Sequence, residues 1–242
     1  MNLFLISSSF LGDASYLEHC KEDLKSFLHA CPSGNIVFVP YAGNNFDTYA
    51  TTAKEFFTKL DPAFGDAFIS LHESANPKQT ITSQPIKAIF IAGGNTFKLL
   101  KTLQDKDLLQ VINQKVRNGA GYMAVSAGTN VACPTIMTTN DMPITTPKDF
   151  NALGLVDFQI NAHFLPGAFA VGHRGETREE RITEYHEEND LTVVGLPEAS
   201  WITTIDHDDL ILCGGNDAVI FNKGQATTPW QVGTKLPLRK RA

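Results

Sequence analysis

Gly121-Tyr-Met-Ala-Val-Ser126-Ala-Gly-Thr-Asn130 runs from an apolar strand through a turn of small residues into the start of a helix. A strand that ends in serine and turns sharply into a helix forms an elbow, which exposes the serine hydroxyl above the edge of a sheet. The following helix N-terminus directs free N–H groups and partial positive charge at that position. The stretch therefore predicts an α/β fold with Ser126 as a candidate nucleophile. Ala-Gly after a strand serine also occurs in purely structural turns, so that alternative stays open.

Strands and helices alternate on the N-terminal side of this elbow. The predicted elements are strands Leu3–Ser7, Asn35–Pro40, Asp66–Leu71 and Lys87–Ala92, and helices Tyr16–Leu28, Thr48–Leu60, Thr96–Leu103 and Leu108–Arg117. Such alternation is typical of βαβ units and a mainly parallel sheet flanked by helices, as in flavodoxin-like folds.

The last third of the chain has a different pattern. A charged helix at about Thr177–Glu187 is followed by short apolar segments with turn signals between them. These segments are Leu191–Leu196, Trp201–Ile205, Leu210–Cys213 and Ala218–Asn222. With a hairpin turn expected at 206–209, they predict a C-terminal antiparallel extension. We expect one α/β domain over residues 1–242.

Composition excludes several classes of protein. The 242 residues are 43% apolar and 19% charged, with 20 basic and 26 acidic side chains giving a net charge of −6. This balance argues against a nucleic-acid surface, and the basic run 239–241 is expected to be a solvated tail. No apolar run is long enough to span a membrane, and the N-terminus lacks the basic leader of a signal peptide. Four cysteines without metal-binding spacing suit a reducing cytosol. We expect a cytoplasmic protein with no membrane association, no metal and no cofactor.

A second glycine turn precedes a helix at Phe90-Ile-Ala-Gly-Gly94-Asn95-Thr96. Two glycines let the backbone turn tightly and present an amide at the end of a neighbouring strand. Gly94 is therefore a candidate second donor to an oxyanion, beside the amide of Ala127. The alternative is a phosphate-binding turn, but the segment has neither the G-x-G-x-x-G spacing nor a P-loop lysine.

His163 is the candidate general base among seven histidines. It ends the apolar run 156–164, so that the end of another strand would bring it beside Ser126. A serine requires such a base because its hydroxyl is a weak nucleophile at neutral pH. His19, His29 and His186 are expected at the surface, and a purely structural role for His163 remains the alternative.

Six segments resemble the peptidase E family of α-aspartyl dipeptidases. They are Ala92-Gly-Gly-Asn-Thr-Phe97, Ser126-Ala-Gly-Thr-Asn130, Ala132-Cys-Pro-Thr-Ile-Met-Thr-Thr-Asn-Asp-Met-Pro143, Ile160-Asn-Ala-His-Phe164, Gly175-Glu-Thr-Arg178 and Leu196-Pro-Glu198. The matches run in order from about Val39 to Trp201, some two-thirds of the chain. The sequence departs from the family at Ala124, where glycine is usual, and by one inserted residue between His163 and Arg178.

The resemblance implies a fold related to class I glutamine amidotransferases and hydrolysis of dipeptides with an N-terminal aspartate. By similarity, Ser126 is the nucleophile and His163 the base. The third member of the triad is Glu198 or Asp141. A strand-end position favours Glu198 as the acid that orients the imidazole, which leaves Asp141 to bind the substrate's α-amino group.

The resemblance also suggests how the substrate is bound. Arg178 is expected to hold the aspartyl carboxylate in bidentate fashion, although an ion pair with Glu179, Glu180 or Glu184 on the same helix is the alternative. Asn95 and Thr139 complete the expected substrate-binding set, and a homodimer is the candidate assembly. The competing functions are a β-aspartyl, cyanophycinase-like peptidase on the same fold and a non-catalytic small-molecule-binding domain.

Overall fold

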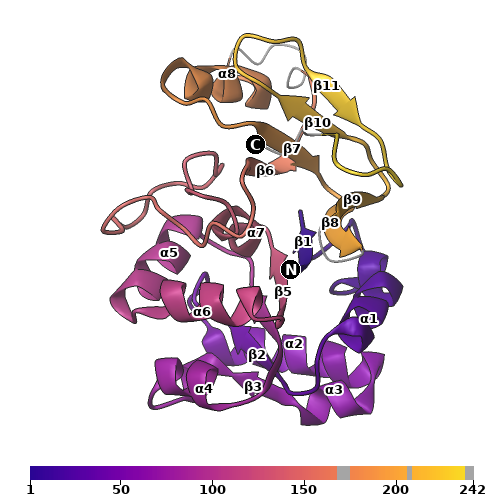
Figure 1. Cartoon of the computed structure of the whole chain (residues 1–242), viewed down its shortest axis with the longest axis vertical. Helices are drawn as coiled ribbons and strands as arrows, with labels where there is room; N and C mark the ends of the chain where they lie inside the picture. Colours follow the sequence, from indigo (N-terminus) through magenta and orange to yellow (C-terminus); the bar gives the residue numbers. More distant parts are fainter. Residues whose placement is uncertain (168–174, 206–208, 238–242) are drawn as a thin grey trace.

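A computed structural model describes residues 1–167, 175–205 and 209–237. Figure 1 shows a large sheet with its helices in the lower part and a smaller sheet, covered by one helix, at the top. The candidate nucleophile ends a strand of the large sheet, and the candidate base lies in a strand of the smaller one. The site is therefore formed where the two sheets meet.

The large sheet has seven strands in the order β3-β2-β4-β5-β1-β8-β9. Their bounds are Phe68–Ser70, Asn35–Val39, Ile86–Ile91, Gly121–Val125, Asn2–Ile6, Ser200–Ile205 and Asp209–Gly214. The first five strands are parallel, and β8 and β9 extend the sheet antiparallel to β1. The predicted mainly parallel α/β sheet is confirmed.

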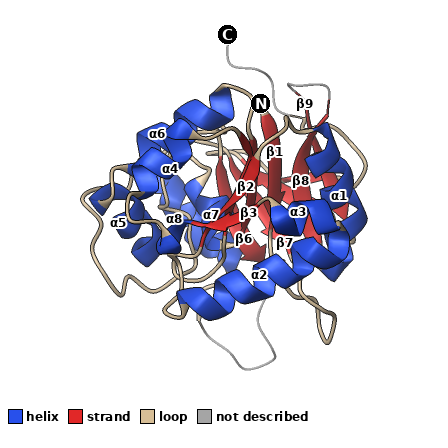
Figure 2. Cartoon of the chain, turned by 90° about the horizontal axis from the view of Figure 1, so that it is seen from below, coloured by secondary structure: helices blue, strands red, loops and turns tan. Residues whose placement is uncertain are grey.

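Helices cover both faces of this sheet (Figure 2). Alternate side chains of β1 explain why: Phe4 and Ile6 pack on one face, whereas Leu3 and Leu5 pack on the other. The first face is covered by α1 (Lys21–Ala30), α2 (Phe46–Leu60) and α3 (Pro62–Asp66). The second is covered by α4 (Pro77–Ser83), α5 (Thr96–Asp105), α6 (Leu108–Arg117) and α7 (Ala127–Val131). Two short 3-10 helices lie at Glu18–Cys20 (η1) and Leu71–Glu73 (η2).

The smaller sheet has the order β11-β10-β7-β6. Its strands are Thr228–Trp230, Ala218–Phe221, Val193–Pro197 and Gln159–Phe164, and β6 and β7 are parallel. Helix α8 (Arg178–Glu188) packs on it through Ile182, which joins Phe164 in a small apolar cluster. Ile160 and Leu196 belong to the same buried cluster as Leu3 of the large sheet, so the two sheets share a core. The single domain over residues 1–242 stays a prediction.

The structure divides the predicted C-terminal extension between the two sheets. Strands β8 and β9 join the large sheet, whereas β7 and β10 belong to the smaller one. Ile205 pairs with Asp209 across the expected hairpin, but residues 206–208 lie outside the described residues, as does the basic run 239–241. Helices α3 and α4 were not predicted, because five to seven residues are too few to show helical periodicity. The helix expected directly after Ser126 is confirmed as α7.

One of the expected surface histidines, His186, is buried instead, and another, His19, is half-buried. His186 lies in the last turn of α8, where its Nε2 atom is 3.0 Å from the carbonyl oxygen of Leu191. The predicted helix from Tyr16 is wrong at its start, because Leu17 has a φ of 54° and the chain first forms η1. That 3-10 turn brings His19 against Trp201, with ring centroids 6.0 Å apart.

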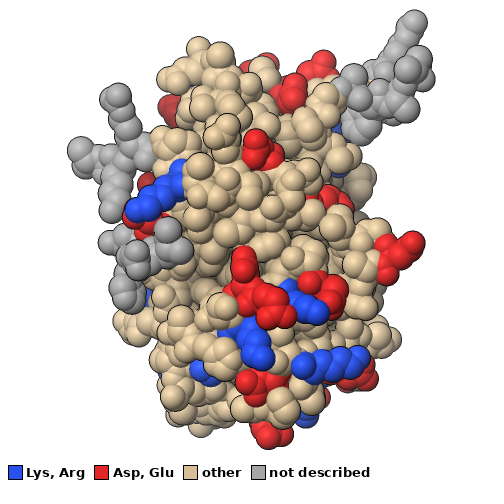
Figure 3. Space-filling model, turned by 90° about the vertical axis from the view of Figure 1, so that its right-hand side faces the viewer, with Lys and Arg blue, Asp and Glu red and all other residues tan. Residues whose placement is uncertain are grey.

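The surface carries mixed charge. Figure 3 shows acidic and basic side chains next to one another on the lower half of one face. This arrangement agrees with the modest net charge of −6. Among the described residues, every helix is too short or too polar to cross a membrane.

Candidate active site

Ser126 forms a sharp turn between β5 and α7. Its φ of 51° and ψ of −105° lie in a region that is costly for a residue with a Cβ atom. The turn is secured from two sides, because the Ser126 N–H donates to the carbonyl oxygen of Ile6 at 3.0 Å and the Thr129 hydroxyl donates to the same oxygen. A Cβ atom on Gly128 would lie 2.6 Å from the carbonyl oxygen of Ile91, so glycine lets α7 pack closely on β4. The strained elbow is thus built into the core.

His163 lies at an irregularity of β6, where the register with β7 shifts. Its φ is 56°, and its backbone N–H donates to the Ser7 hydroxyl at 2.9 Å. The Ser7 hydroxyl in turn donates to the carbonyl oxygen of Leu196, and the Ser7 side chain is fully buried. The imidazole Nε2 atom then lies 2.7 Å from Ser126 Oγ. A buried serine after β1 therefore fixes the backbone of the candidate base.

Glu198 and Ala199 form the turn between β7 and β8. The Glu198 Oε1 atom lies 2.8 Å from His163 Nδ1, on the side of the ring opposite Ser126. Ala199 has a φ of 62°, and Asn216 donates to the Glu198 carbonyl oxygen at 2.9 Å. Ser126, His163 and Ala199 are three of the five non-glycine residues with positive φ in the described part of the chain. Such strain concentrates at functional sites.

Asp141 lies near the same site but is engaged elsewhere. Its Oδ2 atom accepts the backbone N–H of Thr96 at 2.7 Å and the Thr96 hydroxyl at 2.5 Å. These bonds place the carboxylate at the N-terminus of α5, where a negative charge is favourable. The structure brings Glu198 to the imidazole, whereas Asp141 lines the cavity beside Ser126.

The glycine turn after β4 lies against the elbow. A Cβ atom on Gly93 would be 3.4 Å from Ser126 Cβ. Gly94 has a φ of 136°, and a Cβ there would lie 2.5 Å from the carbonyl oxygen of Ala42, so glycine is required. The Ala42 carbonyl oxygen accepts the N–H of Asn95, so the turn is closed by the amide of Asn95 rather than by that of Gly94. Ala127 is the first residue of α7, so its N–H has no partner within the helix.

Asn95 and Thr139 make internal hydrogen bonds. The Asn95 Oδ1 atom accepts the N–H of Lys98 and caps α5, while its Nδ2 atom donates to the carbonyl oxygen of Met142. The Thr139 hydroxyl lies 3.0 Å from that of Thr96. In these positions, the two side chains hold the Asp141 segment against α5.

Arg178 is the first residue of α8 and is half-buried. It shares a helix face with Ile182, four residues on, which packs against Phe164 directly after the candidate base. Its Nε atom is shielded from solvent and has no hydrogen-bond partner among the described residues, and burial together with the charge of Arg181 lowers the pKa of the guanidinium. Within the described residues, no ion pair joins it to an acidic side chain of α8.

A cavity of about 460 Å³ opens onto the elbow. Ser126, His163, Asp141 and the Gly93-Gly94 turn line one part of it. Four aromatic residues, Phe10, Tyr16, Phe38 and Tyr49, line much of the rest, and none of them was among the candidate site residues. The sequence could have placed Phe10 near Ser126, because Phe10 comes soon after β1, and the parallel neighbours β1 and β5 end at the same edge of the sheet.

His19 supplies an unexpected electrostatic neighbour. Neither of its ring nitrogens has a hydrogen-bond partner in the part of the chain that the structure describes, and both are shielded from solvent. Burial lowers the pKa of His19, and the negative charge of Glu198 partly opposes that shift. In the part of the chain that the structure describes, no three His, Cys, Asp or Glu side chains are grouped to hold a metal ion.

The chain is similar to known peptidases over almost its full length. Residues 3–212 match the model of Peptidase family S51. The sequence is 41% identical to Peptidase E from Streptomyces coelicolor, over 98% of this chain and 93% of that protein. It is also 40% identical to Peptidase E from Citrobacter koseri, over 98% of this chain and 100% of that protein.

Solved structures show the same fold. A peptidase from an acI-B1 Actinobacterium matches with a TM-score of 0.69 at 17% identity, covering 97% of this chain and 96% of that one. A putative peptidase E protein from Listeria monocytogenes matches with a TM-score of 0.61 at 20% identity, covering 89% and 98%. At these identities the likeness concerns the fold, and it agrees with the two-sheet architecture described above.

Proposed function

Because the chain belongs to peptidase family S51 and is a serine-type dipeptidase of the peptidase E kind, we propose that Ser126, His163 and Glu198 form its catalytic triad and that its substrates are Asp-Xaa dipeptides. The observation that carries the assignment is the linear arrangement of the three side chains. His163 lies 2.7 Å from Ser126 on one side and 2.8 Å from Glu198 on the other. This arrangement is what acyl transfer by a serine requires.

The reaction proceeds through a covalent aspartyl-enzyme. His163 Nε2 accepts the Ser126 proton while Oγ attacks the carbonyl carbon of the aspartyl residue. Glu198 holds the Nδ1–H tautomer of the imidazole and stabilises the imidazolium that forms. The amides of Gly94 and Ala127 donate to the developing oxyanion. His163 then protonates the leaving amine. In the second half, His163 takes a proton from water as the water oxygen attacks the acyl carbon, and it returns that proton to Ser126 Oγ as the aspartate leaves.

Two charged groups account for the preference for aspartate. Asp141 lines the cavity near Ser126, and we assign it to the substrate's α-ammonium group. Arg178 is assigned to the β-carboxylate, since a half-buried guanidinium whose Nε lacks a partner is the group a carboxylate needs. Asn95 and Thr139 act by fixing the Asp141 segment. A homodimer and a cytoplasmic location remain predictions.

A panel of Xaa-Leu dipeptides tests this function. We expect hydrolysis of Asp-Leu, much weaker hydrolysis of Asn-Leu and Glu-Leu, and none of Ala-Leu. Hydrolysis of β-linked aspartyl peptides without α-Asp-Leu would assign the fold to a β-aspartyl peptidase. A fluorophosphonate probe separates both outcomes from a non-catalytic protein, because only an activated Ser126 is labelled.

A further inference from the structure

The cavity beside Ser126 has an aromatic end. Phe10 is 53% exposed and Tyr49 is 36% exposed, although both side chains are large and line this open cavity. Phe10 contacts the ring of Tyr16 edge-on, with centroids 5.5 Å apart. Exposed apolar surface that faces a cavity marks a place for an apolar group of a ligand.

Two of these rings are held in place. Tyr16 contacts Phe56 of α2 at 5.8 Å and 85°, so its orientation is fixed from behind. A Cβ atom on Gly43 would lie 2.6 Å from the Tyr49 ring, which shows that this ring rests directly on the glycine backbone. A wall that is already ordered loses little conformational entropy when a ligand binds to it.

In the order of the strands, Phe10 lies on the opposite side of Ser126 from Asp141, whereas Tyr49 rests on Gly43, which follows β2. Asp141 is bonded to Thr96, at the start of the helix after β4, whereas Phe10 follows β1. Strand β5, which ends at Ser126, lies between β4 and β1. A substrate whose α-amino group lies toward Asp141 would therefore direct its leaving group toward Phe10.

The charges around the cavity support this direction. Among the described residues that line it, Asp141 is the one charged side chain apart from the titratable His163. An aspartyl carboxylate at the aromatic end would lose its hydration without gaining a cation. The aromatic end is consequently suited to the second residue of the dipeptide rather than to the first.

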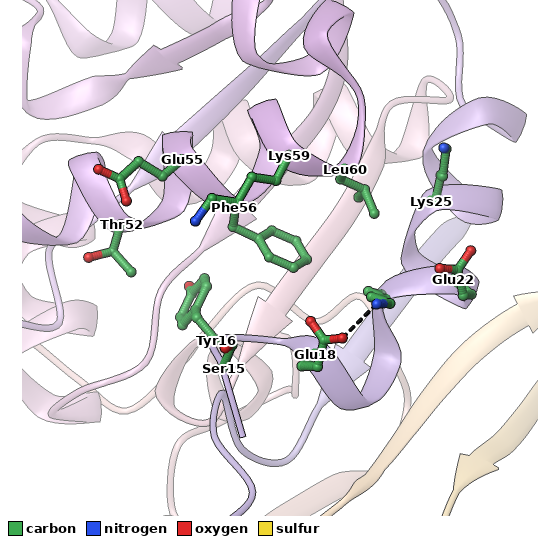
Figure 4. Close-up of a pocket in the computed structure, with 11 residues that line it drawn as sticks. Ser15, Tyr16, Glu18, Glu22, Lys25, Thr52, Glu55, Phe56, Lys59 and Leu60 are labelled. Atoms are coloured by element: carbon green, nitrogen blue, oxygen red, sulfur yellow. Dashed lines mark hydrogen bonds and ion pairs between the residues drawn. The ribbon is translucent and has the colours of Figure 1, made fainter. Parts of the chain in front are cut away.

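A groove with charged side chains begins on the other side of Tyr16. Figure 4 shows the Tyr16 and Phe56 side chains pointing toward each other, with Glu18 and Lys59 near them. Glu18 and Lys21 are paired at 2.5 Å, which reduces their availability to a ligand. The Tyr16–Phe56 contact separates this groove from the cavity that contains Ser126.

We propose that Phe10, Tyr16 and Tyr49 form the subsite for the side chain of the second residue, and that they select Asp-Xaa dipeptides in which Xaa is aromatic or a large aliphatic residue. Because this subsite serves the reaction proposed above, it rests on that function. Thr48 and Thr52, which also line the cavity, offer neutral hydroxyl groups to the polar atoms of the leaving residue.

The test compares kcat/KM for Asp-Phe, Asp-Leu, Asp-Ala and Asp-Lys. For the wild-type enzyme we expect Asp-Phe to exceed Asp-Ala by about 10- to 100-fold, the discrimination that apolar pockets achieve, and Asp-Lys to be poorer than Asp-Leu. Phe10→Ala and Tyr49→Ala should lower the Phe/Ala ratio to within about threefold of unity. Tyr49→Phe keeps the ring and should keep the ratio.

Leu11→Ala is the matched control, because Leu11 is an exposed neighbour of Phe10 that does not line the cavity. It should leave the ratio unchanged. If wild-type enzyme hydrolyses Asp-Ala as well as Asp-Phe, the subsite assignment is wrong while the dipeptidase function stands. If a folded enzyme hydrolyses none of the four peptides, the function proposed above is wrong, and the subsite proposal, which rests on it, is wrong as well.

Discussion

The carboxylate of Glu198 lies 2.8 Å from Nδ1 of His163, whereas that of Asp141 is bonded to Thr96. The two acids should therefore respond differently to amidation. Glu198→Gln should lower kcat by roughly 10⁴-fold, since an amide no longer holds the productive tautomer of the imidazole. Asp141→Asn should act mainly on KM, because it weakens the attraction for the substrate's ammonium group. Steady-state kinetics with Asp-Leu measures both effects. A collapse of kcat in Asp141→Asn with normal turnover in Glu198→Gln would exchange the two roles.

Ser7 should act as a positioning residue. Its hydroxyl accepts the N–H of His163 and donates to Leu196, and Ser7→Ala leaves both backbone groups without that partner. We expect kcat to fall by about 10- to 100-fold with little change in KM, because a small displacement of a catalytic group has that effect. The free energy of unfolding should fall by about 1–3 kcal/mol.

Thr203→Val is the control for Ser7. It removes a comparable hydrogen bond, from the Thr203 hydroxyl to the Leu3 carbonyl oxygen, between the neighbouring strands β8 and β1. The control should lower stability and leave kcat unchanged. Equal losses of kcat in both variants would mean that Ser7 contributes only to folding.

Arg178 should determine the preference for aspartate over asparagine. Removing one partner of a buried charge pair costs about 2–5 kcal/mol, so Arg178→Met should lower kcat/KM for Asp-Leu by roughly 30- to 5,000-fold. Asn-Leu brings no side-chain charge and should lose much less. Arg181→Met is the control, because Arg181 lies on the same helix with an exposed side chain near Glu176. A mutant that retains the full Asp/Asn preference would show that another residue binds the carboxylate.

His19 should make stability sensitive to acid. Burial lowers its pKa in the folded protein, so the unfolded chain binds more protons at mildly acidic pH. The free energy of unfolding should therefore fall as the pH drops through about 6.5, the ordinary pKa of histidine, toward the lower folded value. His19→Phe keeps a ring against Trp201 and should reduce this fall, whereas His29→Phe, at a 56% exposed side chain, should not. Urea unfolding at about pH 7.5 and pH 5.5 measures the difference. An unchanged pH dependence in His19→Phe would contradict the expectation.

Most of the parallel sheet could be predicted because its strands are short apolar runs that end in glycine or serine turns. The strand 121–125 was predicted with its observed bounds, and the elbow at Ser126 followed from it. Strands β7 to β10 were also expected, but their division between two sheets was not. Sheet membership depends on long-range pairing, such as that of Ile6 with Trp201, which leaves no local pattern.

The candidate site could be predicted only in part, for a related reason. Ser126 and His163 lie at strand ends within recognisable segments. The contribution of Ser7 depends on β1 passing beside the end of β6, and nothing in its neighbourhood along the chain indicates a contact with His163. The same holds for the aromatic end of the cavity, because only the fold brings Phe10 and Tyr49 to the same cavity.

The kcat of Ser126→Ala on Asp-Leu decides whether Ser126 is the nucleophile of an Asp-Xaa dipeptidase. Loss of a triad serine lowers turnover by on the order of 10⁶-fold. We predict a loss of that size, with wild-type thermal unfolding as evidence that the fold is intact. If a folded Ser126→Ala enzyme retains even a tenth of wild-type turnover, Ser126 is not the nucleophile.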